Sequence, residues 1–511
     1  MAFVILVVLI AAAEVVFAVR AVKTRASKAG WRRDRLALRT SELAIALIAR
    51  FVPAFGNSWR FTGFLAVVVV LFVWAVVAYL VGRAKAGRAG VVTKSDVHAG
   101  GTADSAGHAQ NADAEHAAHH AEGVRSSKHS ACRPRATLRT RGAAIRGAVL
   151  STLLLAVAAF PAYVFTGYQG LPTTGEHQVA EAQAIFVDAN RLEPRESDGS
   201  HREVPIYFFY PADASPASAA AQAAYPLVVF DHGSFGYYQS NMSTYQELAS
   251  NGYVVAVVEH PYYSLFTHDT SGSIVPVDPQ FMQAVIDVTN DALDANQADA
   301  LVREWMTTRD ADLNLVLDSI ETAQAEGSLS DAWVADSPDQ AAAVLQAVNR
   351  ADLDKIGLMG HSIGGAASMD LARQRTDVDA VIDIDGTMLG EEALVNGSYQ
   401  YNPAPFATPL LALNNEQHGQ QYAQGNPDGT QYVNAYVIEH AADAHSLTFK
   451  GTEHMDFTDL PLFSPMLAGM LGSQNIDHEQ FSTRINHIIL EYCDYYLKGE
   501  GSLAGLDQQG D

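Results

Sequence analysis

The chain has 511 residues, 48% of them hydrophobic and 18% charged, which is too long for one ordinary domain. Its net charge of −24 is unevenly divided, because residues 1–170 hold 21 Lys/Arg and 8 Asp/Glu, whereas residues 171–511 hold 12 and 49. This division indicates a basic membrane region followed by an acidic soluble region, which argues against nucleic acid as a partner. Cys132 and Cys493 lie in different regions, so no disulfide framework is predicted.

Three apolar runs are long enough to cross a bilayer, at residues 1–19, 61–82 and 143–169. The basic cluster follows the first run rather than preceding it, which favours an anchor over a cleaved signal peptide. Glu14 lies within that run. We interpret it either as a polar contact between helices or as a residue that reaches the membrane interface.

Two basic segments define the expected topology. Residues 20–40 are predicted as a cytoplasmic loop, and residues 83–142 as a low-complexity basic linker on the same side. The two segments then need an even number of crossings between them, so a helix at about 36–55 must pair with 61–82. Four spans result, in a multi-pass protein of the cell membrane whose C-terminal domain is extracytoplasmic. If the helix at 36–55 lies on the membrane surface instead, the number of membrane spans is three.

Residues 171–511 are predicted to form an α/β domain. Segments 183–190 and 203–211 are typical of a strand pair. Val/Ile-rich runs separated by helices then indicate a doubly wound, mostly parallel sheet with both faces covered. Residues 278–350 supply either a cap-like insertion or one face of the sheet, and 482–498 form a closing helix. The predicted strands of the sheet are 226–231, 253–259, 355–360, 379–384, 408–414 and 445–450.

The segment Gly360-His361-Ser362-Ile363-Gly364 follows an apolar strand and precedes a helix, which is the form of a nucleophile elbow. In such a turn the serine occupies a strained backbone position, and glycines are needed where a Cβ would collide with neighbouring backbone. The N-terminus of the following helix favours negative charge at the serine. Ser362 is therefore the candidate nucleophile of a serine hydrolase.

A serine nucleophile needs a base, the base needs an orienting carboxylate, and doubly wound hydrolases place them in the order Ser, acid, His. Asp385 is the favoured acid, because it ends a strand and precedes a loop-opening glycine. Asp383 and Glu416 are the alternatives. His454 is the candidate base, because it follows the last predicted strand. The other downstream histidines are expected at the surface or in packing: His418, His440, His445, His478 and His487.

An oxyanion hole needs two backbone N–H donors. One is expected from Ile363, the residue after the nucleophile. The other is expected from Ser234, in the Gly-rich loop that follows strand 226–231. Ser234 itself is not a rival nucleophile, since no strand–turn–helix elbow surrounds it.

Five segments together resemble the plasma-type platelet-activating factor acetylhydrolase family, over roughly residues 180–500. They are YPLVVFDHGSFG, LASNGYVVAVVEHPYYS, GHSIGG, DIDGTMLG and FKGTEHMDFTDL. The resemblance implies an α/β-hydrolase fold and a calcium-independent serine esterase without metal or organic cofactor. Its members cleave short or oxidised acyl chains from the sn-2 position of phospholipids.

By this resemblance the family's nucleophile falls on Ser362, its acid on Asp385, its base on His454 and its oxyanion donors on Ser234 and Ile363. The membrane-spanning N-terminal part departs from the secreted animal members. It resembles the multi-span leader of bacterial membrane-anchored relatives, and this departure bears on the substrate rather than on the chemistry.

The expected function is therefore a membrane-anchored serine ester hydrolase that takes a lipid or small ester. The alternatives are a general carboxylesterase, lipase or polyester hydrolase without phospholipid preference, and a membrane sensor whose hydrolase domain is inactive. The apolar run 460–471 follows the histidine loop. It is interpreted either as dipping into the outer leaflet or as a packed helix that lines the acyl pocket.

Overall fold

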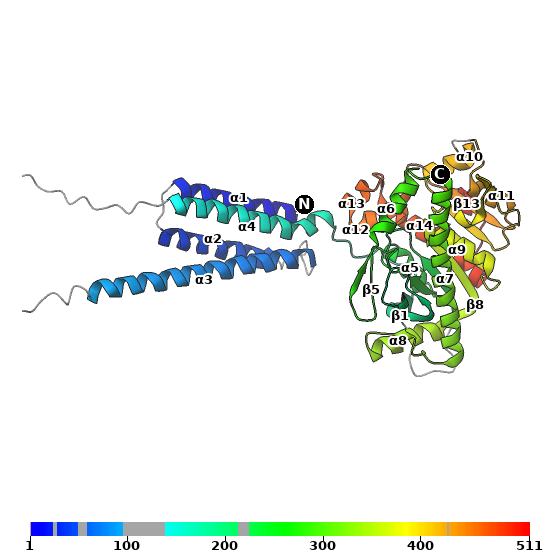
Figure 1. Ribbon diagram of the computed structural model, residues 1–511, viewed down its shortest axis with the longest axis horizontal. Coiled ribbons are helices and arrows are strands. Elements are labelled where there is room, and N and C mark those ends of the chain that lie inside the picture. Colours follow the sequence, from blue (N-terminus) through cyan, green and yellow to red (C-terminus); the bar gives the residue numbers. More distant parts are fainter. Residues whose placement is uncertain are drawn as a thin grey trace, which may run out of the picture. The chain divides into compact units, whose positions relative to one another are not determined.

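The computed structural model describes residues 2–23, 28–49, 59–95, 138–212, 224–426 and 429–510. The chain forms two compact units, Met1–Gly167 and Tyr168–Asp511. We refer to them as the helical unit and the α/β unit (Figure 1).

Four helices make up the described part of the helical unit. Their bounds are α1 Ala2–Lys23, α2 Lys28–Ala49, α3 Trp59–Ser95 and α4 Leu138–Val164. Helix α1 packs against α4, and α2 packs against α3. By length and composition, Phe61–Lys85 in α3 and Ile145–Val164 in α4 are long and apolar enough to cross a membrane. Most of the predicted linker, residues 96–137, lies outside the described residues.

Two boundaries in the helical unit differ from the sequence prediction. The basic segment 20–40, predicted as a loop, is helical from Lys28 onward, so the loop prediction was wrong for that part. Arg, Lys, Leu and Ala are strong helix formers, and here their propensity prevails over the charge density. Helix α3 also continues to Ser95, past the predicted end of the span at residue 82.

A buried polar cluster joins three helices of the helical unit. Arg39 of α2 pairs with Glu14 of α1 and, at 2.5 Å, with Glu42 of α2. Its Nη2 also donates to the Ser151 hydroxyl of α4 at 2.6 Å. All four residues are buried. Of the two interpretations of Glu14, the polar contact between helices is confirmed.

One nine-stranded sheet forms the α/β unit, with the order β13-β12-β9-β8-β3-β4-β2-β1-β7. The strand bounds are β1 Val179–Leu192, β2 His201–Pro211, β3 Tyr225–Asp231, β4 Val254–Val258, β7 Trp333–Val334, β8 Ala351–His361, β9 Ala380–Ile384, β12 Leu410–Asn414 and β13 Ala444–Thr448. All neighbours from β13 to β4 pair in parallel, whereas β2, β1 and β7 are antiparallel. Parallel strands covered on both faces need apolar residues at successive positions, and β4 is buried throughout.

Helices cover both faces of this sheet (Figure 1). Their bounds are α5 Met242–Ser250, α6 Pro279–Thr289, α7 Ala295–Glu326, α8 Pro338–Arg350, α9 Ile363–Gln374, α10 Glu416–Gln424, α11 Val433–His440, α12 Leu460–Phe463, α13 Pro465–Met470 and α14 His478–Cys493. Apolar side chains of α7, α8, α9 and α11 form the core on one face, and those of α5 and α14 form the core on the other. For residues 278–350, the interpretation as one face of the sheet is thus confirmed.

The predicted strands all occur, and the fold is of the predicted α/β-hydrolase type. Two small hairpins add to it, with bounds β5 Phe266–His268 with β6 Ile274–Pro276, and β10 Glu392–Val395 with β11 Ser398–Tyr401. The predicted closing helix ends in a π-helical turn, Asp494–Lys498.

The parallel register brings the carboxyl ends of the central strands to one edge. Asp231 of β3 lies opposite Gly360 of β8, and His361 of β8 lies opposite Ile384 of β9. Ligand-binding residues of doubly wound sheets gather at this edge. The candidate site residues lie in the segments that follow five of these strands. Ser234 follows β3, Ser362 follows β8, Asp385 follows β9, Glu416 follows β12 and His454 follows β13.

Candidate active site

Ser362 is the single residue that connects β8 to α9, at the sharp turn that the sequence predicts. Its φ of 59° and ψ of −128° are unfavourable for any residue with a Cβ. The surrounding structure holds this conformation, because the Ser362 N–H donates to the Ile384 carbonyl of β9 at 2.9 Å. The residue is half-buried at the carboxyl edge of the sheet.

Glycines make this turn possible. A Cβ on Gly360 would lie 2.2 Å from the backbone carbon of Gly364, and a Cβ on Gly364 would lie 2.2 Å from the carbonyl oxygen of Asp231. Backbone atoms cannot move aside as a flexible side chain can. Strand β8, helix α9 and the end of β3 therefore approach one another only with glycine at both positions.

The candidate acid and base meet in the structure. Asp385 Oδ2 lies 2.7 Å from His454 Nδ1, and Asp385 is fully buried. Asn415 fixes the carboxylate from both sides, because its backbone N–H donates to Oδ1 at 2.7 Å and its side-chain amide donates to Oδ2 at 2.9 Å. Burial raises the pKa of Asp385, but contacts with His418 and His454 outweigh it and hold the pKa well below its ordinary value. The acid is therefore ionised at neutral pH.

Neither alternative acid has this geometry. Asp383 accepts a hydrogen bond from the Gly386 N–H at 3.1 Å, and burial and the charge of Asp385 raise its pKa to about 7. Glu416 accepts a hydrogen bond from the Gly451 N–H at 2.8 Å, three residues before His454. Asp383 therefore braces the turn after β9, and Glu416 braces the loop that carries the histidine.

His454 has a defined proton arrangement. An ionised carboxylate only accepts hydrogen bonds, so the neutral ring carries its proton on Nδ1 and leaves Nε2 as the basic nitrogen. Its ring packs on that of His361, with 4.6 Å between centroids, which brings the base beside the residue that precedes Ser362. Burial and the charge of His454 lower the pKa of His361 to about 3, so His361 stays neutral and its Nε2 donates to the His454 carbonyl at 3.2 Å.

The loop after β3 lies against the candidate nucleophile. A Cβ on Gly233 would lie 3.1 Å from Ser362 Cβ, so the Gly233 backbone packs directly on the serine. The Gly233 carbonyl accepts hydrogen bonds from His232 Nδ1 at 2.7 Å and from the Gly236 N–H at 3.0 Å. In a planar trans peptide the N–H points opposite to the carbonyl, so these bonds direct the Ser234 N–H away from His232.

The second expected donor lies at the start of a helix. Ile363 is the first residue of α9, and N–H groups of a first helical turn have no acceptor within the helix. Ser362 thus lies beside the N-terminus of α9 and beside the Gly233 backbone of the loop after β3. Backbone N–H groups at a helix N-terminus favour an anion.

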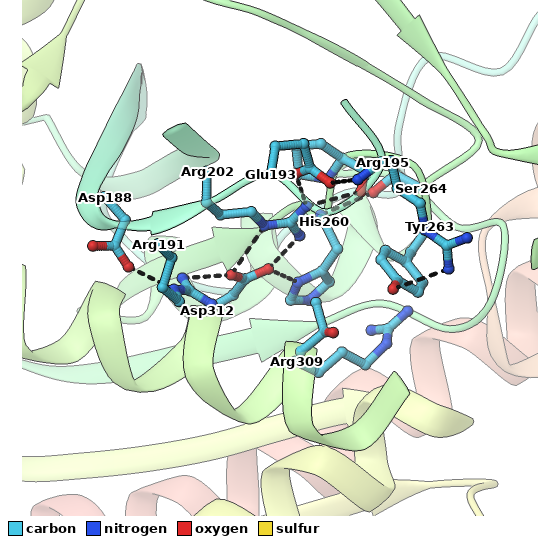
Figure 2. Close-up of polar contacts among 12 residues, drawn as sticks. Asp188, Arg191, Glu193, Arg195, Arg202, His260, Tyr263, Ser264, Arg309 and Asp312 are labelled. Atoms are coloured by element: carbon cyan, nitrogen blue, oxygen red, sulfur yellow. Dashed lines mark hydrogen bonds and ion pairs between the residues drawn. The ribbon is translucent and has the colours of Figure 1, made fainter. Parts of the chain in front are cut away.

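A network of charged side chains lies next to the loop after β3. Its central residue is the buried Asp312 of α7 (Figure 2). Asp312 accepts from Arg202 Nη2 at 2.6 Å and from Arg191 Nη2 at 2.8 Å, and it lies 2.8 Å from His260 Nδ1. Burial raises the pKa of Asp312, but Arg202 and His260 outweigh it and hold the pKa well below its ordinary value.

The network continues to the loop itself. His260 Nε2 lies 2.9 Å from Asp231, the last residue of β3, and Arg309 of α7 pairs with the same carboxylate. Arg309 Nη1 also donates to the carbonyl oxygen of His232 at 2.7 Å. Burial, followed by the charge of Arg309, lowers the pKa of His232 to about 3, so this ring stays neutral. The peptide before Gly233 is thus held by a side chain from 77 residues away.

Several of these residues are missed by the sequence analysis. His418, expected at the surface or in packing, lies 2.9 Å from Asp385 Oδ1, so that expectation was wrong. Asn415 and Arg309 carry no motif. The position of Asn415 at the end of a strand, one residue before the candidate Glu416, is the one signal that marks it.

Comparison with known proteins places the α/β unit in a family. The family described as platelet-activating factor acetylhydrolase, isoform II, matches residues 210–498. A platelet-activating factor acetylhydrolase of Cavia porcellus is 25% identical over 303 residues, which cover 56% of this chain and 59% of that protein. The chain thus spans about three fifths of that relative's length.

A solved structure is also similar. A ferulic acid esterase from Streptomyces cinnamoneus matches with a TM-score of 0.47 and 20% identity, over 65% of this chain and 94% of its own. The family match, in contrast, extends over more than half of the chain and includes Ser362, Asp385 and His454. The chain therefore belongs to the platelet-activating factor acetylhydrolase, isoform II, family.

Proposed function

We propose that the chain is a serine carboxylic ester hydrolase that acts on short or oxidised acyl esters of phospholipids. The contact that carries the proposal is the 2.7 Å approach of His454 Nδ1 to the buried Asp385, at the edge where Ser362 is held in a strained conformation. Membership of the acetylhydrolase family supports the ester as substrate. The relative from Cavia porcellus bears the name of platelet-activating factor acetylhydrolase, which supports the phospholipid.

In the proposed mechanism Ser362 attacks the ester carbonyl while His454 Nε2 takes the hydroxyl proton. Asp385 keeps the imidazole in the tautomer that has Nε2 free and stabilises the imidazolium that forms. The N–H groups of Ser234 and Ile363 stabilise the negative oxygen of the tetrahedral intermediate. His454 then protonates the leaving alcohol, and water releases the acyl group by the same steps. The mechanism uses no metal and no organic cofactor.

We further propose that α3 and α4 anchor the chain in the cell membrane, within a multi-pass helical unit that leaves the α/β unit extracytoplasmic. The apolar stretches Phe61–Lys85 and Ile145–Val164 support an anchor, and the basic residues between the predicted spans support the orientation. Near the histidine loop, Met466, Met470 and Leu471 are exposed, whereas Leu462 and Ala468 are buried. The exposed apolar side chains in and just after α13 support the proposal that the chain binds its substrate at a lipid surface.

Hydrolysis of p-nitrophenyl esters by the full chain in detergent micelles tests the function, with acyl chains of increasing length. We expect activity that is greatest for acetyl and falls steeply for long unmodified chains, followed by release of acetate from a phospholipid with an sn-2 acetyl group. Equal activity on long chains would favour a general carboxylesterase. A folded protein without any activity would favour the membrane sensor.

A paired substitution tests which carboxylate orients the base. Asp385→Asn is expected to lower kcat by about 10³–10⁴-fold, because the wrong imidazole tautomer is then stabilised. Glu416→Gln is expected to lower kcat by less than about tenfold, because its contact with Gly451 only braces the loop. Steady-state kinetics with p-nitrophenyl acetate measure both. An inactive but folded Glu416→Gln beside an active Asp385→Asn would reverse the assignment.

A further inference from the structure

Two arginines of α2 lie against glycines of the neighbouring helices. Helix α3 packs against both α2 and α4. A Cβ on Gly82 of α3 would overlap Arg32 Nη1, and a Cβ on Gly147 of α4 would lie 2.6 Å from Arg35 Nη1. Each guanidinium therefore occupies space that a larger residue would fill. Glycine inside a helix costs stability relative to alanine, and here it admits a charged group between the helices.

Both glycines lie near the same end of the two apolar stretches. Gly82 is three residues before the end of Phe61–Lys85 in α3, and Gly147 is two residues after the start of Ile145–Val164 in α4. The two arginines of α2 that contact them therefore lie at the depth where an apolar span meets the polar headgroups of a bilayer.

The arginines at this depth lack acceptors. Among the residues that the structure describes, Arg32 has no hydrogen bond and no ion pair, and Arg35 has one long hydrogen bond, from Nη2 to the Ser151 hydroxyl at 3.4 Å. Both arginines are half-buried. The Arg35 guanidinium lies 5.3 Å from the ring centroid of Trp31, whose buried indole N–H also has no acceptor within the described part of the chain. The first turns of α2 thus present donors without acceptors.

Arg39, one turn further along α2, shows the contrast. It forms ion pairs with Glu14 and Glu42, so its charge is balanced inside the helical unit. No carboxylate of the described residues lies within ion-pair distance of Arg32 or Arg35. A guanidinium in apolar surroundings needs an anionic partner. The described residues thus supply an anion for Arg39 and none for the other two arginines.

We propose that Arg32 and Arg35 bind the phosphate group of an anionic phospholipid between α2, α3 and α4. The inference rests on the proposed membrane anchor and is independent of the hydrolase mechanism. A guanidinium matches two oxygens of a phosphate with two parallel N–H donors. A phosphate diester also brings only acceptors to a place that presents only donors.

The proposed topology explains why the lipid is anionic. It puts this end of the helical unit on the cytoplasmic side, where the membrane surface carries anionic lipids. Arg83 and Arg146, next to the two glycines, are exposed and add positive charge there. These charges attract a headgroup with net negative charge and repel the ammonium group of a zwitterionic one. The lipid is not the substrate, because the α/β unit follows the last span and is extracytoplasmic in the same topology.

Native mass spectrometry of the full chain in detergent micelles tests the proposal. Phosphatidylglycerol and phosphatidylcholine with identical acyl chains are added separately, and the fraction of protein with one bound lipid is measured against lipid concentration. We expect phosphatidylglycerol to bind at least about tenfold more tightly. Arg32→Gln should weaken its binding about fivefold, and the double variant Arg32→Gln/Arg35→Gln about 25-fold, while binding of phosphatidylcholine stays unchanged.

Arg33→Gln is the matched control. Arg33 is next to Arg32 on α2 and has the same charge, but its side chain is 75% exposed and contacts Asp34. Its replacement should leave the preference for phosphatidylglycerol at the wild-type value. Arg32 makes no hydrogen bond with the described residues, so Arg32→Gln removes no contact that holds the fold. This single variant decides the question even if the double variant does not fold.

A pair of glycine substitutions in α3 tests the same contact without removing a charge. Gly82→Ala should displace the Arg32 guanidinium and weaken binding of phosphatidylglycerol about as much as Arg32→Gln does. In contrast, a Cβ on Gly63 meets no atom within 4 Å, so Gly63→Ala should bind the lipid as the wild type does.

The outcomes separate this inference from the proposed function. Equal binding of the two phospholipids by the wild type overturns it, and so does an Arg33→Gln variant that loses as much affinity as Arg32→Gln. If inorganic phosphate at the same concentration displaces phosphatidylglycerol, the site takes a free anion and the lipid is wrong. If the chain is soluble and monomeric without detergent, the proposed anchor fails and the inference fails with it. The ester hydrolysis assay decides the proposed chemistry separately.

Discussion

Replacing Ser362 with alanine is expected to lower kcat for p-nitrophenyl acetate by about 10⁴–10⁶-fold, while the folded structure is retained. The hydroxyl oxygen is the atom that forms the acyl bond in the proposed mechanism, and no covalent intermediate forms without it. The remaining activity would come from water attacking a substrate that is still bound and still polarised by the oxyanion donors.

The structure predicts that this substitution is well tolerated. The side chain of Ser362 is half-buried, and the interactions that hold the turn are made by its backbone. Alanine keeps the Cβ that already occupies the strained conformation, so the backbone cost is unchanged. The unfolding temperature should therefore differ little from that of the wild type.

Ser368→Ala is the matched control, because Ser368 lies in the same helix α9 and is buried. It is expected to keep kcat within about threefold of wild type, which shows that losing a hydroxyl from α9 is not enough to stop the reaction. A folded Ser362→Ala that retains more than about one hundredth of the wild-type kcat would exclude Ser362 as the nucleophile.

The second large effect is expected on stability. Asp312→Asn should lower the free energy of unfolding by about 3–5 kcal/mol, because it removes the carboxylate that the buried Arg202 shares with the partly exposed Arg191. Asp312 is fully buried, and Arg202 is 2% exposed, so water cannot replace the lost carboxylate. Chemical denaturation of the detergent-solubilised full chain, followed by tryptophan fluorescence, measures the difference.

The pH dependence of this difference gives a sharper test. The pKa of Asp312 in the folded chain is held well below its ordinary value by Arg202 and His260, against the opposing effect of burial. A carboxylate with a lowered folded pKa stabilises the fold above its unfolded pKa of about 3.9, and this contribution is lost as the pH falls toward the folded pKa. The difference between wild type and Asp312→Asn should be constant above about pH 5 and shrink below about pH 4.

Asp318→Asn is the control on the same helix α7. Asp318 pairs with Arg375 at 2.7 Å, but its side chain is 59% exposed, so the substitution should cost less than about 1 kcal/mol. The proposed stabilising role of Asp312 would be contradicted if Asp312→Asn also lowered the free energy of unfolding by less than about 1 kcal/mol. It would also be contradicted if the difference in this free energy between wild type and Asp312→Asn stayed constant below about pH 4.

The sequence by itself determined the class of fold and the elbow. Both depend on residues that are close together in the chain. The Val/Ile runs of β3 and β4 predict buried parallel strands because their neighbours on both faces must be apolar. Gly360, Ser362 and Gly364 predict the turn because a Cβ at either glycine would collide with backbone. The sequence did not determine the start of α2 at Lys28. The density of basic residues there predicted a loop, whereas the helix propensity of the same residues favours a helix.

Only the tertiary structure decided which polar groups surround the acid and the loop. Asp385 and His454 are 69 residues apart, and Arg309 reaches the His232 carbonyl across 77 residues. Such contacts arise where a parallel sheet brings the ends of distant strands to one edge and where a helix packs against that edge, and no local pattern encodes them. His418 and Asn415 were missed for the same reason. Both lie against the carboxylate of Asp385, 30 or more residues earlier in the chain, and a buried charge takes its partners from the residues that the fold brings close to it.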